Sequence, residues 1–413
     1  MIHVAVMGYG TIGSGVVEVL NINHDSIAKR AGEAIEVKYV LDLRDFPGDP
    51  IQDKIVHDYK VIAEDPEIGM VVETMGGVEP AYTFVRAMLE AGKHVTTSNK
   101  ALVAEKGAEL IALAKEKNVN FLFEASVGGG IPIIRPLYRC LKGEVIEEIT
   151  GILNGTTNYI LTRMDRAGVS FEAALKEAQD MGYAERNPEA DVEGHDTCRK
   201  IAILTAMATG KEANYEDIYT EGITRITDVD FQYAEKLGAS VKLFGSSRID
   251  GEQVHAWVAP VMIGRDHVLY SVSDVFNGVM VKGNMVGTTM FYGSGAGKLP
   301  TASAVVADII AAVRHKNMNI AIGWSEERQT IAPMDTSSYR YFVRVDGNCE
   351  ENRSRVEAVF GKAELTVLDG LDEFAFVTEK MTEAAFKEKA VEFDSACQAF
   401  GKKGILQMIR AEL

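Results

Sequence analysis

The stretch from 185 to 200 contains charged residues of the types that handle a carbonyl substrate. Asp196 and Lys200 are four residues apart, so in a helix they share one face. On an exposed face they would form a weak ion pair, but the apolar run at 201–207 predicts a largely buried helix and a lysine held in a cleft. A carbonyl that accepts a hydride becomes an alkoxide, and an ammonium group can donate the proton it needs. Lys200 is therefore our candidate proton donor, and Asp196 either orients it or holds a substrate ammonium group.

A glycine-rich loop near the N-terminus predicts a dinucleotide site. Residues 8–13 match G-x-G-x-x-G, directly after an apolar run at 2–7 and directly before a helical segment. The three glycines permit, in turn, a tight bend, the approach of a pyrophosphate and close packing of the helix on the sheet: Gly8, Gly10 and Gly13. The backbone amides at the start of the helix complete the anion site, and these belong to Thr11 and Ile12.

The residues after the second predicted strand bear on the choice of cofactor. Asp42 suits the ribose diol of NAD, whereas Arg44 suits the 2′-phosphate of NADP. Because both are present, either cofactor remains possible.

Lys100 marks a further point on the same side of the predicted sheet. It follows the strand at 94–97 and begins a helix, at the carboxyl edge where doubly wound folds bind their ligands. We expect Lys100 to contact cofactor and substrate and to assist proton transfer, although it could also be a surface lysine at a helix start. The strand at 70–74 ends at the same edge, so Thr74 is expected to contact the cofactor.

The elements that position these residues fall into three predicted domains. Strands and helices alternate over residues 1–143, which predicts an α/β Rossmann domain with a doubly wound parallel sheet, completed by a helix near 301–316. Residues 144–320 have a mixed α+β pattern, which predicts a second domain, and the family resemblance given below implies that this domain binds substrate and forms the dimer. After a polar linker at 321–338, residues 339–413 follow the order βαββαβ, with a second helix at 382–400, which is ferredoxin-like.

Bulk composition narrows the function. The net charge of -17 over 413 residues repels phosphate backbones and anionic lipid, so we expect no nucleic-acid and no membrane partner. No apolar stretch approaches 18 residues, and the N-terminus lacks the basic region of a signal peptide. The four cysteines are widely spaced, which predicts reduced thiols in a cytoplasmic protein.

Several further segments carry a family resemblance. They read VTTSNKAL at 95–102, EASVGGGIP at 124–132, GILNGTTNY at 151–159, GYAE at 182–185 and DVEGHD at 191–196. With Lys200, they make the sequence resemble homoserine dehydrogenase over roughly residues 1 to 320. The resemblance implies a homodimeric or larger enzyme that interconverts L-homoserine and L-aspartate 4-semialdehyde with NAD(P), in threonine and methionine biosynthesis.

The same resemblance assigns roles to individual residues. Lys200 matches the family's catalytic lysine, Glu185 matches a ligand of the substrate ammonium, and Asp191 belongs to the same polar pocket. Gly297 lies in a second glycine loop that closes over the cofactor, and Gly182 is also expected at the cofactor. In this family a glycine-rich turn holds sodium or another monovalent cation through main-chain oxygens, here those of Glu124, Val127, Gly129 and Ile131. That turn could equally be a purely structural one.

The C-terminal segment resembles ACT domains, which bind amino acids in biosynthetic enzymes. Residues 345–350 read VDGNCE and lack the proline typical of the first ACT loop, so the architecture can be present without an amino-acid effector.

Two other functions compete with the dehydrogenase. A thioester-forming enzyme of the aspartate-semialdehyde dehydrogenase type needs a cysteine beside a histidine, and neither Cys140 nor Cys198 fits well. A dinucleotide-sensing protein would need the glycine loop but would have no use for the charged residues between 185 and 200.

Overall fold

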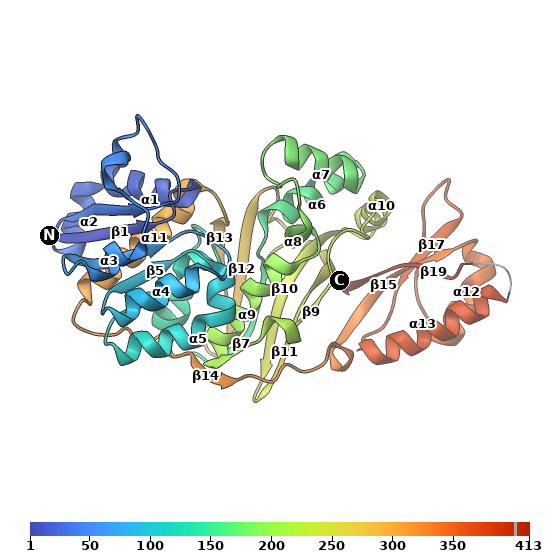
Figure 1. Cartoon of the computed structure of the whole chain (residues 1–413). Helices are drawn as coiled ribbons and strands as arrows, with labels where there is room; N and C mark the ends of the chain where they lie inside the picture. The colour runs from blue at the N-terminus through green and yellow to red at the C-terminus, as the bar shows by residue number, and fades with distance from the viewer. Residues whose placement is uncertain (400–402) are drawn as a thin grey trace. The chain divides into compact units, whose positions relative to one another are not determined.

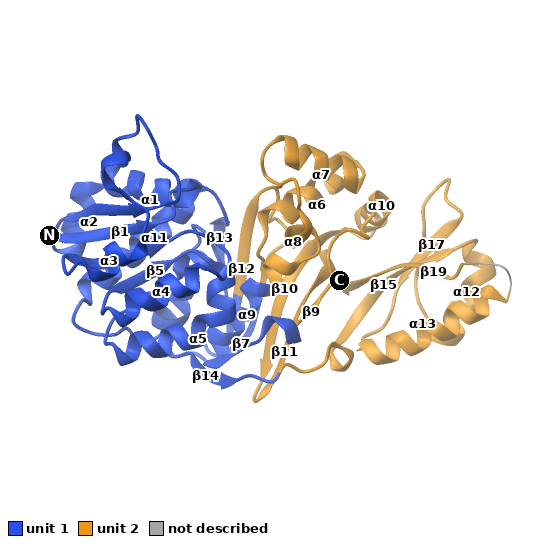
Figure 2. Ribbon diagram, viewed as in Figure 1, with its two compact units in different colours: residues 1–149, 199–217, 281–330 blue, residues 150–198, 218–280, 331–413 orange. Residues whose placement is uncertain are grey.

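The computed structural model of the chain describes residues 1–399 and 403–413. The chain forms two compact units, each assembled from separate stretches of sequence (Figures 1 and 2). The first unit comprises residues 1–149, 199–217 and 281–330. The second unit comprises residues 150–198, 218–280 and 331–413. None of the helices in the described ranges combines the length and the apolar character needed to cross a bilayer.

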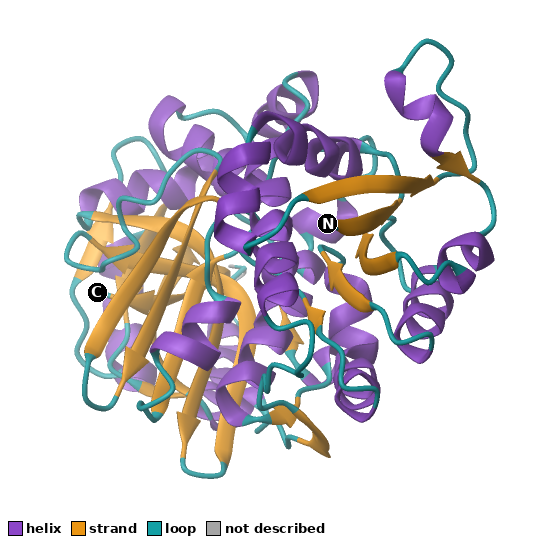
Figure 3. Ribbon diagram, turned by 90° about the vertical axis from the view of Figure 1, so that its left-hand side faces the viewer, coloured by secondary structure: helices purple, strands orange, loops and turns teal. Residues whose placement is uncertain are grey.

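The first unit contains a parallel sheet of six strands in the order β3-β2-β1-β4-β5-β6. The strands are β1 (Ile2–Met7), β2 (Ile35–Leu41), β3 (Ile55–Val56), β4 (Ile68–Glu73), β5 (His94–Thr97) and β6 (Phe121–Leu122). Its main helices are α1 (Thr11–Ile22), α2 (His24–Ala31), α3 (Tyr59–Glu64), α4 (Ala81–Glu90), α5 (Lys100–Glu116) and α11 (Lys298–Arg314). Figure 3 draws helices in purple and strands in orange.

The strand sequences explain this parallel sheet. Strands covered on both faces read as continuous apolar runs, and β1 is fully buried from Val4 to Met7. The predicted Rossmann-like parallel sheet is confirmed. The helix α11 begins at Lys298, three residues before the predicted start, because Gly297 serves as its N-cap and Pro300 fits in the first turn.

The second unit contains an antiparallel pair of long strands, β10 (Ala239–Asp250) and β11 (Gln253–Gly264). Beside them lie the helices α6 (Gly155–Ala167), α7 (Phe171–Asp180), α8 (Glu189–Val192) and α10 (Asp228–Lys236), with the short strand β9 (Tyr219–Thr220). The helix α9 (His195–Thr209) follows α8 in the chain.

The C-terminal elements of the second unit are β15 (Ser338–Asp346), α12 (Cys349–Phe360), β16 (Leu365–Val367), β17 (Glu373–Val377), α13 (Glu383–Gln398) and β19 (Ile405–Glu412). The strand order β19-β15-β17-β16, with antiparallel neighbours, follows the predicted βαββαβ succession. The predicted end of the second helix at Phe400 lies outside the described residues. β19 also pairs with β11, and one aromatic core, including Trp257 and Tyr341, extends across both parts.

The predicted linker at 321–338 contains more structure than its polar sequence indicates. The strand β14 (Ser325–Arg328) pairs with β8 (Lys211–Glu212) in the first unit. Just before it, the Trp324 ring lies where a Cβ on Gly107 would meet it at 2.8 Å. Strand β14 has no alternating apolar pattern, because all four of its residues are exposed.

Candidate active site

The predicted cofactor residues of the first unit lie along one edge of its sheet. The strands β2, β1, β4 and β5 are neighbours, and parallel strands end at the same edge. The strands β1 and β4 flank the point where the strand order reverses, which is where doubly wound sheets bind ligands. The predicted residues that follow these four strands are Asp42 and Arg44 after β2, Gly8 after β1, Thr74 after β4 and Lys100 after β5.

The glycine loop has the geometry that the motif requires. Gly8 has a φ of +96°, which favours glycine, and the Thr74 hydroxyl donates a hydrogen bond to its carbonyl at 2.9 Å. A Cβ on Gly13 would lie 1.9 Å from the same carbonyl, so only glycine lets α1 start this close to β1. A Cβ on Gly10 would meet no atom within 4 Å, which leaves open space beside the loop for a ligand. The N-cap residue of α1, Gly10, makes no side-chain hydrogen bond to the first turn of this helix, which contains Thr11 and Ile12.

Asp42 and Arg44 form a tight pair after β2. The Arg44 side chain donates to both Asp42 carboxylate oxygens, from Nε at 3.0 Å and from Nη2 at 3.1 Å, and the Tyr9 amide also donates to Asp42, at 2.8 Å. Arg44 lowers the pKa of Asp42 to about 2, chiefly through the side-chain hydrogen bonds. The Arg44 side chain is 62% exposed and lies over the Phe46 ring. The guanidinium can therefore reach a ligand while Asp42 is largely occupied.

Lys100 is the first residue of α5, and polar contacts of the preceding residue, Asn99, hold this end of the helix. Asn99 is the N-cap, accepting from the Leu102 amide at 3.2 Å and donating to the Gly77 carbonyl at 2.6 Å. It also lies within 3.5 Å of Glu73, a fully buried carboxylate at the end of β4 whose pKa is raised by burial. Lys100 itself is half-buried. Sequence reasoning missed Glu73, since a single acid at a strand end has no distinctive spacing.

In the second unit, the structure brings together two of the predicted acids. The Asn154 side chain donates from Nδ2 to Asp191 at 2.7 Å and to Asp196 at 2.8 Å. Asn154 is the N-cap of α6, and its Oδ1 accepts from the Thr157 amide at 2.8 Å. Asp191 lies on α8 and Asp196 in the first turn of α9, so three helix termini meet at this point. Asn154 was missed as a functional residue, although the N-cap spacing to Thr157 was visible.

Lys200 lies one turn after Asp196 on α9 and is 8% exposed. The next residues, from Ile201 to Leu204, are buried, so the predicted buried helix is confirmed. Glu185 is exposed in the loop between α7 and α8. Gly182 lies at the start of that loop with a φ of +76°.

The predicted cation turn packs against the second glycine loop. A Cβ on Gly129 would lie 2.3 Å from the Gly295 carbonyl oxygen, and the Gly130 amide donates to the Ser294 carbonyl at 3.0 Å. Gly297, with a φ of +114°, ends the second loop as the N-cap of α11. Only glycines allow the two loops to approach so closely.

The carboxylate of Glu124 is occupied within this turn. It accepts from the amides of Ile133, Ile134 and Arg135 at 2.7–2.9 Å, so only its main-chain oxygen is left for an ion. Among the turns and loops of the described ranges, no backbone amide donates to the main-chain oxygens of Val127, Gly129 or Ile131, whereas Glu124 begins a short 3-10 helix that ends at Ser126. The carbonyl oxygens of these three buried residues are of the type that holds a monovalent cation.

A buried charge pair supports the same turn. Asp308 on α11 accepts from the Glu124 amide at 2.8 Å and pairs with the Arg135 guanidinium. Burial and the nearby Glu124 carboxylate raise the pKa of Asp308. The sequence did not reveal this pair, because its members are 173 residues apart.

A parallel sheet with a glycine-rich loop at its switch point defines the chain as a dinucleotide-binding protein of the Rossmann type. Comparison with family models then gives the substrate: the model described as homoserine dehydrogenase matches residues 132–310, and the one described as homoserine dehydrogenase, NAD binding domain, matches residues 8–124. The chain belongs to the homoserine dehydrogenase family.

Individual relatives agree over almost the whole chain. The homoserine dehydrogenase of Bacillus subtilis is 37% identical over 409 residues, which cover 94% of this chain and 93% of the relative. The crystal structure of a homoserine dehydrogenase from Thiobacillus denitrificans superposes with a TM-score of 0.92 at 34% identity, covering 100% of this chain and 98% of that one. A hyperthermophilic archaeal homoserine dehydrogenase in complex with NADPH gives a TM-score of 0.64 at 26% identity, covering 75% and 97%.

The chain therefore interconverts L-homoserine and L-aspartate 4-semialdehyde by hydride transfer with NAD(P), a step of amino-acid biosynthesis. The predicted enzyme class is confirmed. The two competing functions, a thioester-forming enzyme and a dinucleotide sensor, are no longer supported. In the structure, Cys140 is exposed and Cys198 is buried.

Proposed function

We propose that Lys200 donates a proton from Nζ to the carbonyl oxygen of the semialdehyde during reduction, and takes it back during homoserine oxidation. The nicotinamide cofactor supplies or accepts the hydride. The observation that carries the proposal is the burial of Lys200 on α9, directly before the buried apolar run that begins at Ile201, because a desolvated ammonium group stabilises an alkoxide more strongly than a solvated one. Lys100, at the carboxyl edge of the sheet, assists this transfer.

The substrate ammonium group is the proposed partner of Asp191, Asp196 and Glu185. Asp191 and Asp196 approach one amide nitrogen from two helices, so two like charges face the same point. A zwitterionic amino acid presents an ammonium group, and carboxylates are the side chains that hold such a group through charge-assisted hydrogen bonds. Glu185, on the exposed loop before α8, would add a third carboxylate.

Removing the Asp191 charge should weaken homoserine recognition selectively. We expect Asp191→Asn to lower kcat/KM for homoserine about 30-fold or more, since breaking a buried charge pair costs at least about 2 kcal/mol. Binding of 4-hydroxybutyrate, which lacks the ammonium group, should not change when it is measured as a competitive inhibitor. Glu189→Gln, at an exposed acid on α8, is the matched control. Equal losses for both ligands would overturn the assignment.

The proposed cofactor site consists of Gly8, Gly10, Thr11, Ile12, Gly13, Asp42, Arg44, Thr74, Lys100, Gly182 and Gly297. Arg44 would hold the 2′-phosphate of NADP, and Asp42 the ribose hydroxyls of NAD. The exposed guanidinium and the occupied carboxylate favour NADP, and the archaeal relative that binds NADPH is consistent with this preference.

A change at Arg44 tests the cofactor proposal. Arg44→Ala should lower kcat/KM for NADP about 10-fold to 100-fold, because the 2′-phosphate loses a charge-assisted hydrogen bond. The value for NAD should stay within about 2-fold, since NAD has no 2′-phosphate. Steady-state kinetics with each cofactor measure the ratio. Lys60→Ala, on α3, is a surface control. A variant that loses NAD and NADP activity equally would contradict a contact with the 2′-phosphate.

Two further proposals concern the assembly and the cation. A sodium or similar ion would be held by the main-chain oxygens of Glu124, Val127, Gly129 and Ile131, where it would fix the turn against the second glycine loop. We also propose a homodimer formed through the α+β domain at 144–320, and a cytoplasmic location, which four free cysteines support.

The C-terminal residues 339–413 are proposed to be an ACT-like domain that responds to an amino acid. A cavity of about 820 Å³ lies within the second unit, between the segment at 219–227 and the strand β19. Its lining includes Glu193 and Arg225, whose opposite charges would suit the ammonium and carboxylate groups of an effector. Gly222 packs directly on Glu193, because a Cβ there would lie 2.5 Å from the Glu193 Cα.

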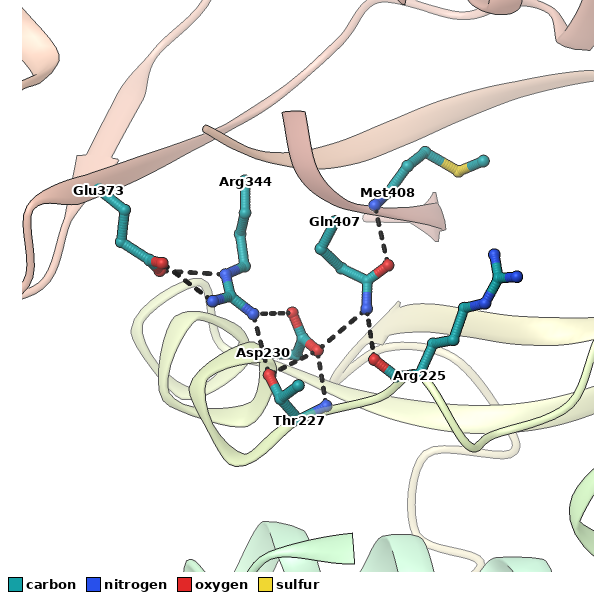
Figure 4. Close-up of polar contacts among 7 residues, drawn as sticks. All are labelled: Arg225, Thr227, Asp230, Arg344, Glu373, Gln407 and Met408. Atoms are coloured by element: carbon teal, nitrogen blue, oxygen red, sulfur yellow. Dashed lines mark hydrogen bonds and ion pairs between the residues drawn. The ribbon is translucent and has the colours of Figure 1, made fainter. Parts of the chain in front are cut away.

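Polar contacts connect the C-terminal elements to this segment (Figure 4). Arg344 on β15 donates to Asp230 on α10 at 2.7 Å and to Glu373 on β17 at 2.9 Å. Gln407 on β19 donates to the Arg225 carbonyl at 2.8 Å. A movement of β19 would therefore reach the cavity wall.

Threonine is the effector to test first. We expect millimolar threonine to lower homoserine oxidation, and Arg225→Ala to abolish that inhibition while the basal rate stays within about 2-fold, because the Arg225 side chain is exposed. Arg353→Ala, an exposed arginine on α12, should leave the inhibition intact. An unchanged rate at millimolar threonine would count against an effector role.

A further inference from the structure

Glu73, the last residue of β4, has a fully buried carboxylate that accepts hydrogen bonds from two loops. The Met75 amide donates to its Oε1 at 2.7 Å, and the Gly76 amide donates to the same oxygen at 3.4 Å. The Thr97 hydroxyl, at the end of β5, donates to its Oε2 at 2.5 Å. One side chain therefore ties the loop after β4 to the loop after β5.

The Thr97 hydroxyl connects Glu73 to the start of α5. Because its single proton is donated to Glu73, its oxygen is left to accept, and the Asn99 amide donates to it at 2.9 Å. Asn99 is the N-cap of α5, and its side chain also donates to the Gly77 carbonyl at 2.6 Å. The loop after β4 and the first residue of α5, Lys100, are thus placed by contacts that begin at one buried carboxylate.

These two loops lie in the half of the sheet that is expected to receive the nicotinamide nucleotide. A doubly wound sheet in this strand order consists of two mononucleotide-binding halves, which meet at the switch point between β1 and β4. Asp42 and Arg44, the proposed contacts of the adenosine ribose, follow β2 in one half. The other half, formed by β4, β5 and β6, is left for the nicotinamide nucleotide, and Glu73 and Thr97 both belong to it.

We propose that Glu73 is a positioning residue for hydride transfer: it fixes the loops after β4 and β5 so that the nicotinamide ring is held in its reactive position. This inference rests on the proposed cofactor site. Each of the contacts that tie the loops uses Glu73 as an acceptor, which an ionised carboxylate satisfies at both oxygens. A glutamine has the same shape but presents a donor at one of these positions, so either the Thr97 hydroxyl or the two loop amides would lose their acceptor.

The sharpest test removes the two ends of one hydrogen bond in turn. Glu73→Gln and Thr97→Val should each lower kcat for homoserine oxidation about 10-fold to 100-fold, because a small displacement of a reacting group is enough for such a loss. The affinity for NADPH should fall as well. The affinity for adenosine 2′,5′-bisphosphate, which lacks the nicotinamide nucleotide, should stay within about 2-fold. The double variant should lose little more than either single variant, because both changes break the same bond.

Two further variants separate positioning from stability. Thr97→Ser keeps the hydroxyl and should hold kcat within about 3-fold of the wild-type value. Thr162→Val is the matched control, because this buried threonine of α6 also donates to one acceptor, the Asn158 carbonyl at 2.6 Å, and accepts from one backbone amide, that of Asp274 at 2.9 Å. It should lower the melting temperature about as much as Thr97→Val does and leave kcat unchanged.

Thermal unfolding shows whether each variant is folded. If Glu73→Gln does not fold, the comparison of Thr97→Val with Thr97→Ser carries the test. An unchanged kcat and NADPH affinity in folded Thr97→Val would overturn the role of Glu73. Equal losses of affinity for NADPH and for the bisphosphate would instead overturn the proposed cofactor site, in which the two halves of the sheet hold different nucleotides.

Discussion

Lys200→Ala should lower kcat for homoserine oxidation by about 10²-fold to 10⁴-fold, the usual contribution of a positioned proton donor or acceptor. The KM for cofactor should stay within about 2-fold, because the glycine loop is untouched. Steady-state kinetics of the purified variant, followed through the absorbance of the reduced nicotinamide, measure both values. The loss is expected at every pH, since alanine cannot titrate.

Lys242 provides a matched control for the loss of a buried lysine. It is 2% exposed on β10, burial lowers its pKa to about 8, and its Nζ donates to the Val272 carbonyl at 2.9 Å. Lys242→Met should cost about 1–3 kcal/mol of stability, because that carbonyl loses its donor, and should leave kcat nearly unchanged. Activity retained in Lys200→Ala would move the proton transfer to Lys100.

Gly13→Ala should abolish measurable cofactor binding and destabilise the first unit. The added Cβ would lie 1.9 Å from the Gly8 carbonyl oxygen, so either α1 or the end of β1 must shift. Such overpacking costs about 1–3 kcal/mol or more, and the shift displaces the amides that face the pyrophosphate. Fluorescence titration with NADPH and thermal unfolding measure the two effects.

Substitutions at two other glycines separate the loss of stability from the loss of cofactor binding. A Cβ on Gly10 meets no protein atom within 4 Å, so Gly10→Ala should keep the melting temperature and lose affinity only through contact with the cofactor. Gly69 on β4 also has open space, and Gly69→Ala should change neither property. Normal NADPH affinity in Gly13→Ala would contradict a dinucleotide site at this loop.

Local patterns were enough to predict the parallel sheet, its glycine loop and the buried helix α9. The loop is recognisable because two of its glycines meet local backbone demands: Gly8 has a positive φ, and a Cβ on Gly13 would collide with the Gly8 carbonyl. Apolar periodicity likewise reports burial along one segment, and Ile201 and Leu204 are buried as it predicts.

Features that depend on distant contacts were not predictable from local patterns. Asn154 meets acids 37 and 42 residues away, and neither spacing has a signature in one sequence. The pairing of β19 with β11 joins the C-terminal strands to the preceding sheet. Residue patterns predict where strands lie but not which strands pair with each other. Glu185 was placed by resemblance alone, and its exposed position leaves its role to experiment.

The most direct test of the account is homoserine oxidation by the purified chain. L-homoserine is added with NADP and with NAD in turn, and the absorbance of the reduced nicotinamide is followed. We expect homoserine-dependent reduction of the cofactor, and this reduction should be faster with NADP than with NAD. No reduction of either cofactor, in a protein that still binds one of them in a fluorescence titration, would contradict it.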